Sequence, residues 1–159
     1  MSHFYHFMTA YSSSSTSATP NITQILGQWA EDCACFHLQQ HGWHIVARNF
    51  HSRYGELDII AQRQHTLAFV EVKARTHQQY GTAVEMLSPA KQKKLMKTAL
   101  YFMQQHEHLA QLDYRFDLFA IQFQHSNAYN VQCLQHNHPI SYQYEWIEHA
   151  FCLELDAWN

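Results

Sequence analysis

Charged side chains stand within two apolar segments that follow one another between Tyr54 and Arg75. Residues 55–61 and 66–74 alternate in polarity with the two-residue period of a half-buried β-strand. The connection at residues 62–65 is too short for the crossover that parallel strands need, so we expect an antiparallel hairpin. The rest of the chain must fold around a hairpin that carries these charges.

The alternation assigns the side chains of the hairpin to two faces. We expect the first strand to place Glu56, Asp58 and Ile60 on one face and Leu57, Ile59 and Ala61 on the other. We expect the second strand to place Leu67, Phe69, Glu71 and Lys73 on one face and Ala68, Val70 and Val72 on the other. The hairpin can therefore gather Asp58, Glu71 and Lys73 on a single surface.

Two carboxylates and one ammonium are costly to bury unless they pair with each other or bind a cation. An E-x-K pattern alone favours a partly buried Lys73 that pairs with Glu71 or Asp58. The acid on the preceding strand favours a metal site, because Mg²⁺ and Mn²⁺ prefer oxygen ligands and Mg²⁺ takes one or two carboxylates with waters and phosphate. Lys73, about 6.6 Å along the strand from Glu71, could orient an attacking water or neutralise a phosphate.

The basic residues are concentrated in the middle of the chain. All ten Lys and Arg lie between Arg48 and Arg115 with six acids, so this segment has a net charge of +4 in a chain whose net charge is −3. A basic segment around an acidic cluster suits a phosphate-handling site, although a lysine-rich helix face is usually only solvated surface. The candidates for nucleic-acid contacts are Arg48, Arg53, Arg75, Lys91 and Lys94.

The composition predicts one domain, since 159 residues with 47% hydrophobic content can form a core. We expect residues 1–20 to form a flexible Ser/Thr-rich leader and residues 21–159 a single domain, with a His/Gln-rich loop near 124–145. The four cysteines show no C-x-x-C pair, which argues against a zinc site or a disulfide framework. No apolar run reaches the roughly 20 residues of a membrane span, and residues 1–20 contain no Lys or Arg, unlike a secretory signal. We therefore expect a cytoplasmic protein without a membrane partner.

Caps and hydrophobic periodicity predict the other elements. A helix is expected to begin near Asn21 and to end at Gly42. Ser88 and Pro89 are typical of a helix start, and this second helix is expected to bury Leu95, Met96, Ala99, Phe102 and Met103. Strands are expected at 43–50, 114–123 and 130–134, and a short terminal element at 146–153.

Glu31 lies on the side of the first helix opposite to its main apolar stripe, which ordinarily indicates a solvated residue. Ala34 and Leu38 share that side, however, so the helix can be covered on two faces and Glu31 can face a site.

Ordered motifs run through most of the chain. They are G-Q-W-A-E at 27–31, H-G-W-H-I-V-A-R-N at 41–49, G-E-L-D-I-I at 55–60, L-A-F-V-E-V-K-A-R at 67–75, Y-G-T-A-V-E at 80–85, K-Q-K-K-L from 91, R-F-D at 115–117 and W-I-E-H-A-F at 146–151. In this order the sequence resembles the YraN family of uncharacterised bacterial proteins. That family is similar to PD-(D/E)XK nucleases and, among them, to archaeal Holliday-junction resolvases.

The resemblance implies an α/β, restriction-endonuclease-like fold with a three-layer core. A mixed central sheet would be flanked by helices in the order α-β-β-β-α-β. By position it implies a catalytic set of Glu31, Asp58, Glu71 and Lys73. Asp58 and Glu71 would ligate Mg²⁺ or Mn²⁺, Glu31 would support the metal or a bound water, and Lys73 would assist the attacking water.

The resemblance also implies an endonuclease that acts on structured DNA in repair or recombination. A homodimer would fit this activity, because resolvases of the kind it resembles act as dimers to cut two strands. Two alternatives stay open. The same fold could bind structured nucleic acid without cleaving it, or it could serve as a scaffold for proteins alone.

Overall fold

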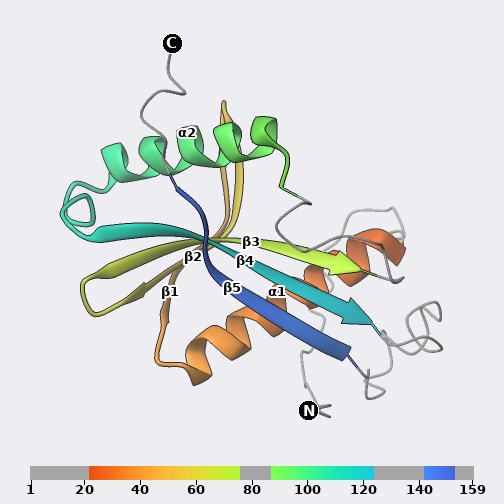
Figure 1. Ribbon diagram of the computed structural model, residues 1–159. Helices are drawn as coiled ribbons and strands as arrows, with labels where there is room; N and C mark the ends of the chain where they lie inside the picture. The colour runs from red at the N-terminus through yellow and green to blue at the C-terminus, as the bar shows by residue number, and fades with distance from the viewer. Residues whose placement is uncertain (1–21, 76–86, 124–141, 153–159) are drawn as a thin grey trace, which may run out of the picture.

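A five-stranded mixed sheet lies between two helices in the computed structural model of this chain (Figure 1). The structure describes residues 22–75, 87–123 and 142–152. The elements in chain order are α1 (Ile22–Gln40), β1 (His44–Ser52), β2 (Gly55–Arg63), β3 (Thr66–Arg75), α2 (Pro89–Gln105), β4 (Asp113–Phe123) and β5 (Tyr142–Phe151). This arrangement confirms an α/β chain with a mixed central sheet flanked by helices.

The strands follow one another across the sheet in the order β1-β2-β3-β4-β5. Strands β3 and β4 are parallel, and the other three neighbouring pairs are antiparallel. The β2–β3 hairpin therefore has the antiparallel form predicted from its short connection. In the described ranges, neither helix combines the length and hydrophobicity that crossing a membrane requires.

A hydrophobic core lies on each face of the sheet. Beneath α1 the buried residues include Leu26, Ala30, Cys33, Leu38, Ile59, Ala61, Ala68, Val70, Phe119 and Ile121. Beneath α2 they include Leu57, Ile60, Leu67, Phe69, Leu95, Phe102, Phe116 and Leu118. Strands β3 and β4 contribute to both cores, which confirms the interior position predicted for 114–123 and holds the centre of the sheet rigid.

The first helix ends where its sequence predicts. Gly42 has a φ of +78°, a conformation that glycine adopts without the strain of a side chain. The Trp43 N–H donates to the Leu38 carbonyl at 3.0 Å, which closes the last turn of α1 and turns the chain into β1.

The alternation predicted for the first strand of the hairpin is wrong at its centre. Leu57 and Ile60 both pack beneath α2, whereas Ile59 and Ala61 both pack beneath α1. The faces exchange at Asp58 because the pairing of β2 with β3 ends there. The faces predicted for β3 are confirmed.

The final strand is longer than the sequence indicates. We expected a His/Gln-rich loop to continue to residue 145, but β5 begins at Tyr142 and pairs with β4. The strand forms because Tyr142 and Tyr144 contact His37 of α1, while Gln143 and Glu145 are exposed. The observed order is therefore α-β-β-β-α-β-β, with one strand more than the expected α-β-β-β-α-β. The expected leader at 1–20, the strand at 130–134 and the remainder of the loop lie outside the described residues.

Ser88 fixes the start of α2. Its Oγ accepts a hydrogen bond from the Lys91 backbone N–H at 3.3 Å, and Pro89 occupies the first helical position, as predicted. The five residues expected on the buried face of this helix are all buried. The cap therefore determines where the first turn of α2, including Lys91, stands relative to the sheet.

Removing this cap should destabilise the protein without disturbing the core. We expect Ser88→Ala to lower the free energy of unfolding by about 1 kcal/mol, as measured by urea denaturation. Ser88→Asp keeps an acceptor at the same position and should remain close to the parent. Equal stabilities of the parent and Ser88→Ala would contradict a capping role.

Candidate active site

Strands β2 and β3 separate within the sheet and form a fork. Their pairing runs from Arg63 and Thr66 to Ile59 and Val70. Beyond that point β2 continues only with β1 and β3 only with β4, so the β1–β2 end rises toward α2 (Figure 1). The fork exposes backbone groups that a continuous ladder would have paired.

Asp58 lies at the base of the fork and pairs one of these groups. Its Oδ2 accepts a hydrogen bond from the Val72 backbone N–H at 2.7 Å. In a continuous ladder a backbone carbonyl of β2 would accept from this N–H. Here the Asp58 carboxylate accepts instead, and it links the two strands where their ladder ends.

Glu71 lies on the α2 side of the same fork and is only 2% exposed. Its Oε1 accepts hydrogen bonds from Lys73 Nζ at 2.6 Å and Lys91 Nζ at 2.9 Å. Its Oε2 is buried and has no hydrogen-bond partner within the described part of the chain. A buried carboxylate oxygen without a partner is costly, so a cation or a water bound here would satisfy it.

Burial and the neighbouring Glu71 carboxylate together raise the pKa of Asp58 to about 7. The Val72 N–H and the Lys91 ammonium act in the opposite direction, and the charge of Glu31 adds a smaller upward contribution. Asp58 therefore exchanges its proton near neutral pH, and binding of a cation would favour loss of that proton.

The paired carboxylates suit a hard divalent cation. Mg²⁺ binds through one or two carboxylates and keeps several waters, and Mn²⁺ shares its preference for oxygen ligands. Nowhere in residues 22–75, 87–123 and 142–152 do three or more His, Cys, Asp or Glu side chains form a group able to hold a metal. The residues present thus fit a site completed by water and substrate oxygens rather than a closed protein cage.

Glu31 approaches the site from α1. Its Oε2 accepts a hydrogen bond from Asn49 Nδ2 at 3.0 Å, and Arg48 lies 3.7 Å away. Burial raises the pKa of Glu31 despite the opposing effects of these two partners. The structure brings its charge close enough to act on Asp58 but does not place it in a common ligand group, so its role at a metal stays a prediction.

Two of the five predicted nucleic-acid contacts form ion pairs with acids of the described chain. Lys91 binds Glu71, and Arg48 binds Asp32 at 2.6 Å. Arg53, in the turn between β1 and β2, and Lys94, on α2, are both exposed. Arg75 ends β3. Arg48, Arg53 and Lys94 are therefore the three residues of this set that are exposed.

Sequence reasoning missed two partners of the acidic residues. Lys91 was expected to contact nucleic acid, but its ammonium lies on Glu71. The Ser88 cap was the one sequence signal for this contact, because it places Lys91 in the first turn of α2. Asn49 holds Glu31, and its φ of +50° is a conformation that asparagine adopts more readily than most residues.

A further buried carboxylate, Asp117 in β4, belongs to a separate network. It accepts hydrogen bonds from Arg115 Nη2 at 3.0 Å, Trp146 Nε1 at 2.9 Å and the His149 N–H at 3.1 Å. Arg115 also binds Glu148 at 2.9 Å. With three donors on its carboxylate, Asp117 joins β4 to β5 and is not a candidate ligand.

The raised pKa of Asp58 makes the stability of the protein depend on pH. Because the folded state disfavours the charged form, this group costs nothing below about pH 4, and its cost grows as the pH rises to about 7. In chelator, we expect Asp58→Asn to melt at a higher temperature than the parent at pH 8, with a smaller difference at pH 5.

The matched control is Glu107→Gln, an exposed acid outside the fork that should follow the parent at both pH values. Addition of Mg²⁺ at pH 8 should raise the melting temperature of the parent and leave that of Asp58→Asn unchanged. A melting difference that does not depend on pH would contradict the assigned environment of Asp58.

Known proteins resemble the chain over most of its length. A family model described as an uncharacterised protein family, UPF0102, matches residues 30–121, which include Glu31, Asp58, Glu71 and Lys73. A UPF0102 protein of Acinetobacter baumannii (strain AYE) is 43% identical over 133 residues, or 84% of this chain and 98% of the relative. A UPF0102 protein of Vibrio parahaemolyticus is 36% identical over 110 residues, or 69% of this chain and 88% of the relative.

Proposed function

This chain belongs to the uncharacterised protein family UPF0102, and we propose that it is a divalent-metal-dependent endonuclease acting on structured DNA. The observation that carries the proposal is the carboxylate pair in the fork, a buried Glu71 that binds two ammonium groups and a half-buried Asp58. The order of elements, with Asp58 on β2 and Glu71-x-Lys73 on β3, supports a restriction-endonuclease-like core of the PD-(D/E)XK kind. A resolvase-like role in repair or recombination and a homodimer are parts of the same proposal.

Asp58 and Glu71 would hold Mg²⁺ or Mn²⁺ in this mechanism. When bound, such an ion supplies Lewis-acid stabilisation of the phosphate and lowers the pKa of a bound water. Asp58 would offer its second oxygen, since the first accepts the hydrogen bond from the Val72 N–H. Glu71 would offer Oε2, which has no hydrogen-bond partner in the described chain.

Lys73 and Lys91 would act on the substrate. Both are about one-third exposed at the side chain, so their ammonium groups can reach solvent while they contact Glu71. Lys73 would orient the attacking water, and both ammonium groups would stabilise the charge that develops on the phosphate. Glu31 would act through its charge, which favours the protonated form of Asp58 until a cation binds.

A second candidate function rests on the two lysines themselves. Glu71 Oε1 already accepts from Lys73 and Lys91, so the fork is partly neutralised without a metal. A fork whose Glu71 charge is neutralised by lysines would suit a nucleic-acid-binding module that does not cleave. The salt dependence of binding would be strong in either case, so only turnover separates the two.

Cleavage assays distinguish these functions. We expect the parent to cut branched, flapped or linear DNA in Mg²⁺ or Mn²⁺, and we expect Asp58→Asn and Glu71→Gln to abolish the cut. Lys73→Ala should lower the rate by about 10²-fold or more, because it removes a donor that acts on developing charge. Glu107→Gln should cut at the parental rate.

Two results would count against the endonuclease. Cleavage that survives Asp58→Asn would remove the assigned mechanism. Salt-sensitive binding of the same DNA without cleavage in either ion would favour the binding module.

A further inference from the structure

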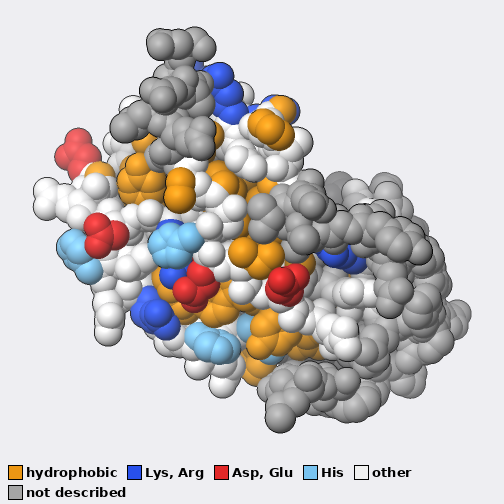
Figure 2. All heavy atoms as spheres, in the orientation of Figure 1, with side chains coloured by type: hydrophobic (Ala, Val, Ile, Leu, Met, Phe, Trp, Pro, Cys, Tyr) orange, Lys and Arg blue, Asp and Glu red, His pale blue; other side chains and the backbone are white. Residues whose placement is uncertain are grey.

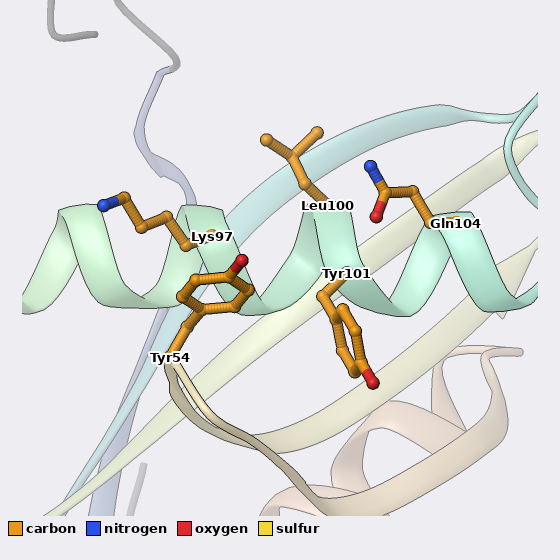
Figure 3. Close-up of a pocket in the computed structure, with 5 residues that line it drawn as sticks. All are labelled: Tyr54, Lys97, Leu100, Tyr101 and Gln104. Atoms are coloured by element: carbon orange, nitrogen blue, oxygen red, sulfur yellow. The ribbon is translucent and has the colours of Figure 1, made fainter.

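We propose that the pocket between the β1–β2 turn and the exposed side of α2 binds an unpaired nucleotide of the strand that enters the fork. This inference rests on the proposed function, because it adds a substrate contact beside the same site. The pocket has a volume of about 270 Å³ and is lined by Tyr54, Lys97, Leu100, Tyr101 and Gln104. Figure 3 shows Tyr54 reaching from the turn to α2, with Lys97 on one side and Tyr101 on the other.

The two tyrosines form an aromatic platform. Their ring centroids lie 6.1 Å apart at an interplanar angle of 72°, and the Tyr101 ring also contacts Phe50 at 6.4 Å. Both tyrosines are half-buried, so part of each side chain remains accessible to solvent. Every nucleobase has an aromatic face, and stacking on a protein ring tolerates any base sequence.

The platform is held in place before any ligand binds. Arg53 Nη2 donates to the Tyr54 hydroxyl at 2.6 Å, and the Arg53 guanidinium lies 4.8 Å from the centre of the same ring. The Tyr54 N–H donates to Ser52 Oγ at 3.0 Å, and Ser52 Oγ in turn donates to Thr98 Oγ1 of α2 at 3.3 Å. A ring fixed in this way loses little entropy when a base stacks on it.

Basic side chains connect the pocket to the fork. Lys91, on Glu71, and Lys97, in the pocket, stand six residues apart on α2, or about 9 Å along the helix. Stacked nucleotides of one strand rise 3.4 Å each, so this axial offset alone corresponds to at least roughly two nucleotides. Lys94 lies between them, and neither Lys94 nor Lys97 forms an ion pair with an acid of the described chain.

The charge around the pocket favours a polyanion as the occupant. Basic side chains appear at the top of the view, where α2 and the β1–β2 turn stand in Figure 1, whereas acidic and basic side chains are mixed lower in the same view (Figure 2). Among the pocket residues, Lys97 can neutralise a phosphate, and Gln104 offers an amide to the edge of a base. A stacking surface beside unpaired cations is the combination that single-stranded nucleic acids require.

The consequence concerns the class of substrate. A nucleotide can reach the platform only if its base is unstacked from a duplex, so the strand held beside the fork must be unpaired at a position at least about two nucleotides from the cut. Flaps, branches and single strands meet this condition, whereas an uninterrupted duplex does not. The stacking chemistry is shared by DNA and RNA.

Binding can be measured without cleavage by keeping Ca²⁺ in place of Mg²⁺. The probes are 12-nucleotide single strands that carry one 2-aminopurine, made as DNA and as RNA, and a blunt DNA duplex of the same sequence. We expect both single strands to bind the parent more tightly than the duplex does, with 2-aminopurine fluorescence quenched on binding. Tighter binding of one single strand identifies DNA or RNA as the source of the nucleotide.

Three tyrosine variants test the platform. Tyr101→Ala should weaken single-strand binding at least fivefold and remove the quenching, because loss of one stacking partner typically costs 1–3 kcal/mol per base. Tyr101→Phe keeps the ring and should bind like the parent. Tyr114→Ala, in β4, removes a tyrosine that is 42% exposed outside the pocket and should also bind like the parent.

The outcomes separate this inference from the proposed function. If Tyr101→Ala binds and quenches the single strands as the parent does, the inference is overturned, whatever the protein cleaves. If Tyr101→Ala loses binding and the parent cleaves nothing in Mg²⁺ or Mn²⁺, the nucleotide pocket stands and the nuclease does not. A thermal melt of each variant ensures that lost binding does not reflect unfolding.

Discussion

The candidate site depends on one hydrogen bond, from the Val72 N–H to the Asp58 carboxylate. A sheet whose ladder stops in its interior leaves backbone donors without partners, and this carboxylate satisfies one of them where β2 and β3 part. The faces of β2 exchange at the same residue, with Leu57 beneath α2 before it and Ile59 beneath α1 after it.

The fork brings like charges together at a cost that the surrounding sheet must offset. Glu71 raises the free energy of the charged form of Asp58, and the two lysines contact only Glu71. The rigid cores on both faces of β3 and β4 hold this arrangement, because neither strand can shift without opening a cavity. Paired carboxylates that destabilise the folded state are more readily explained by a role in binding or catalysis than by a role in stability.

Elements that follow local rules could be predicted from the sequence. The Ser88-Pro89 start, the Gly42 end of α1 and the alternation of β3 each depend on a few neighbouring residues. The start of β5 was missed because a His- and Gln-rich composition outweighed the alternation of Tyr142 and Tyr144. The exchange of faces at Asp58 and the contact of Lys91 with Glu71 depend on which strands pair and where α2 returns, which no local pattern contains.

We propose that the carboxylate pair in the fork holds a divalent ion, and direct titration with Mn²⁺ tests this proposal. We expect one Mn²⁺ per chain at pH 8, with weaker binding and greater proton release near pH 6 and no binding in Glu71→Gln. Absence of Mn²⁺ binding to the parent at pH 8, or binding that Glu71→Gln leaves intact, would contradict it.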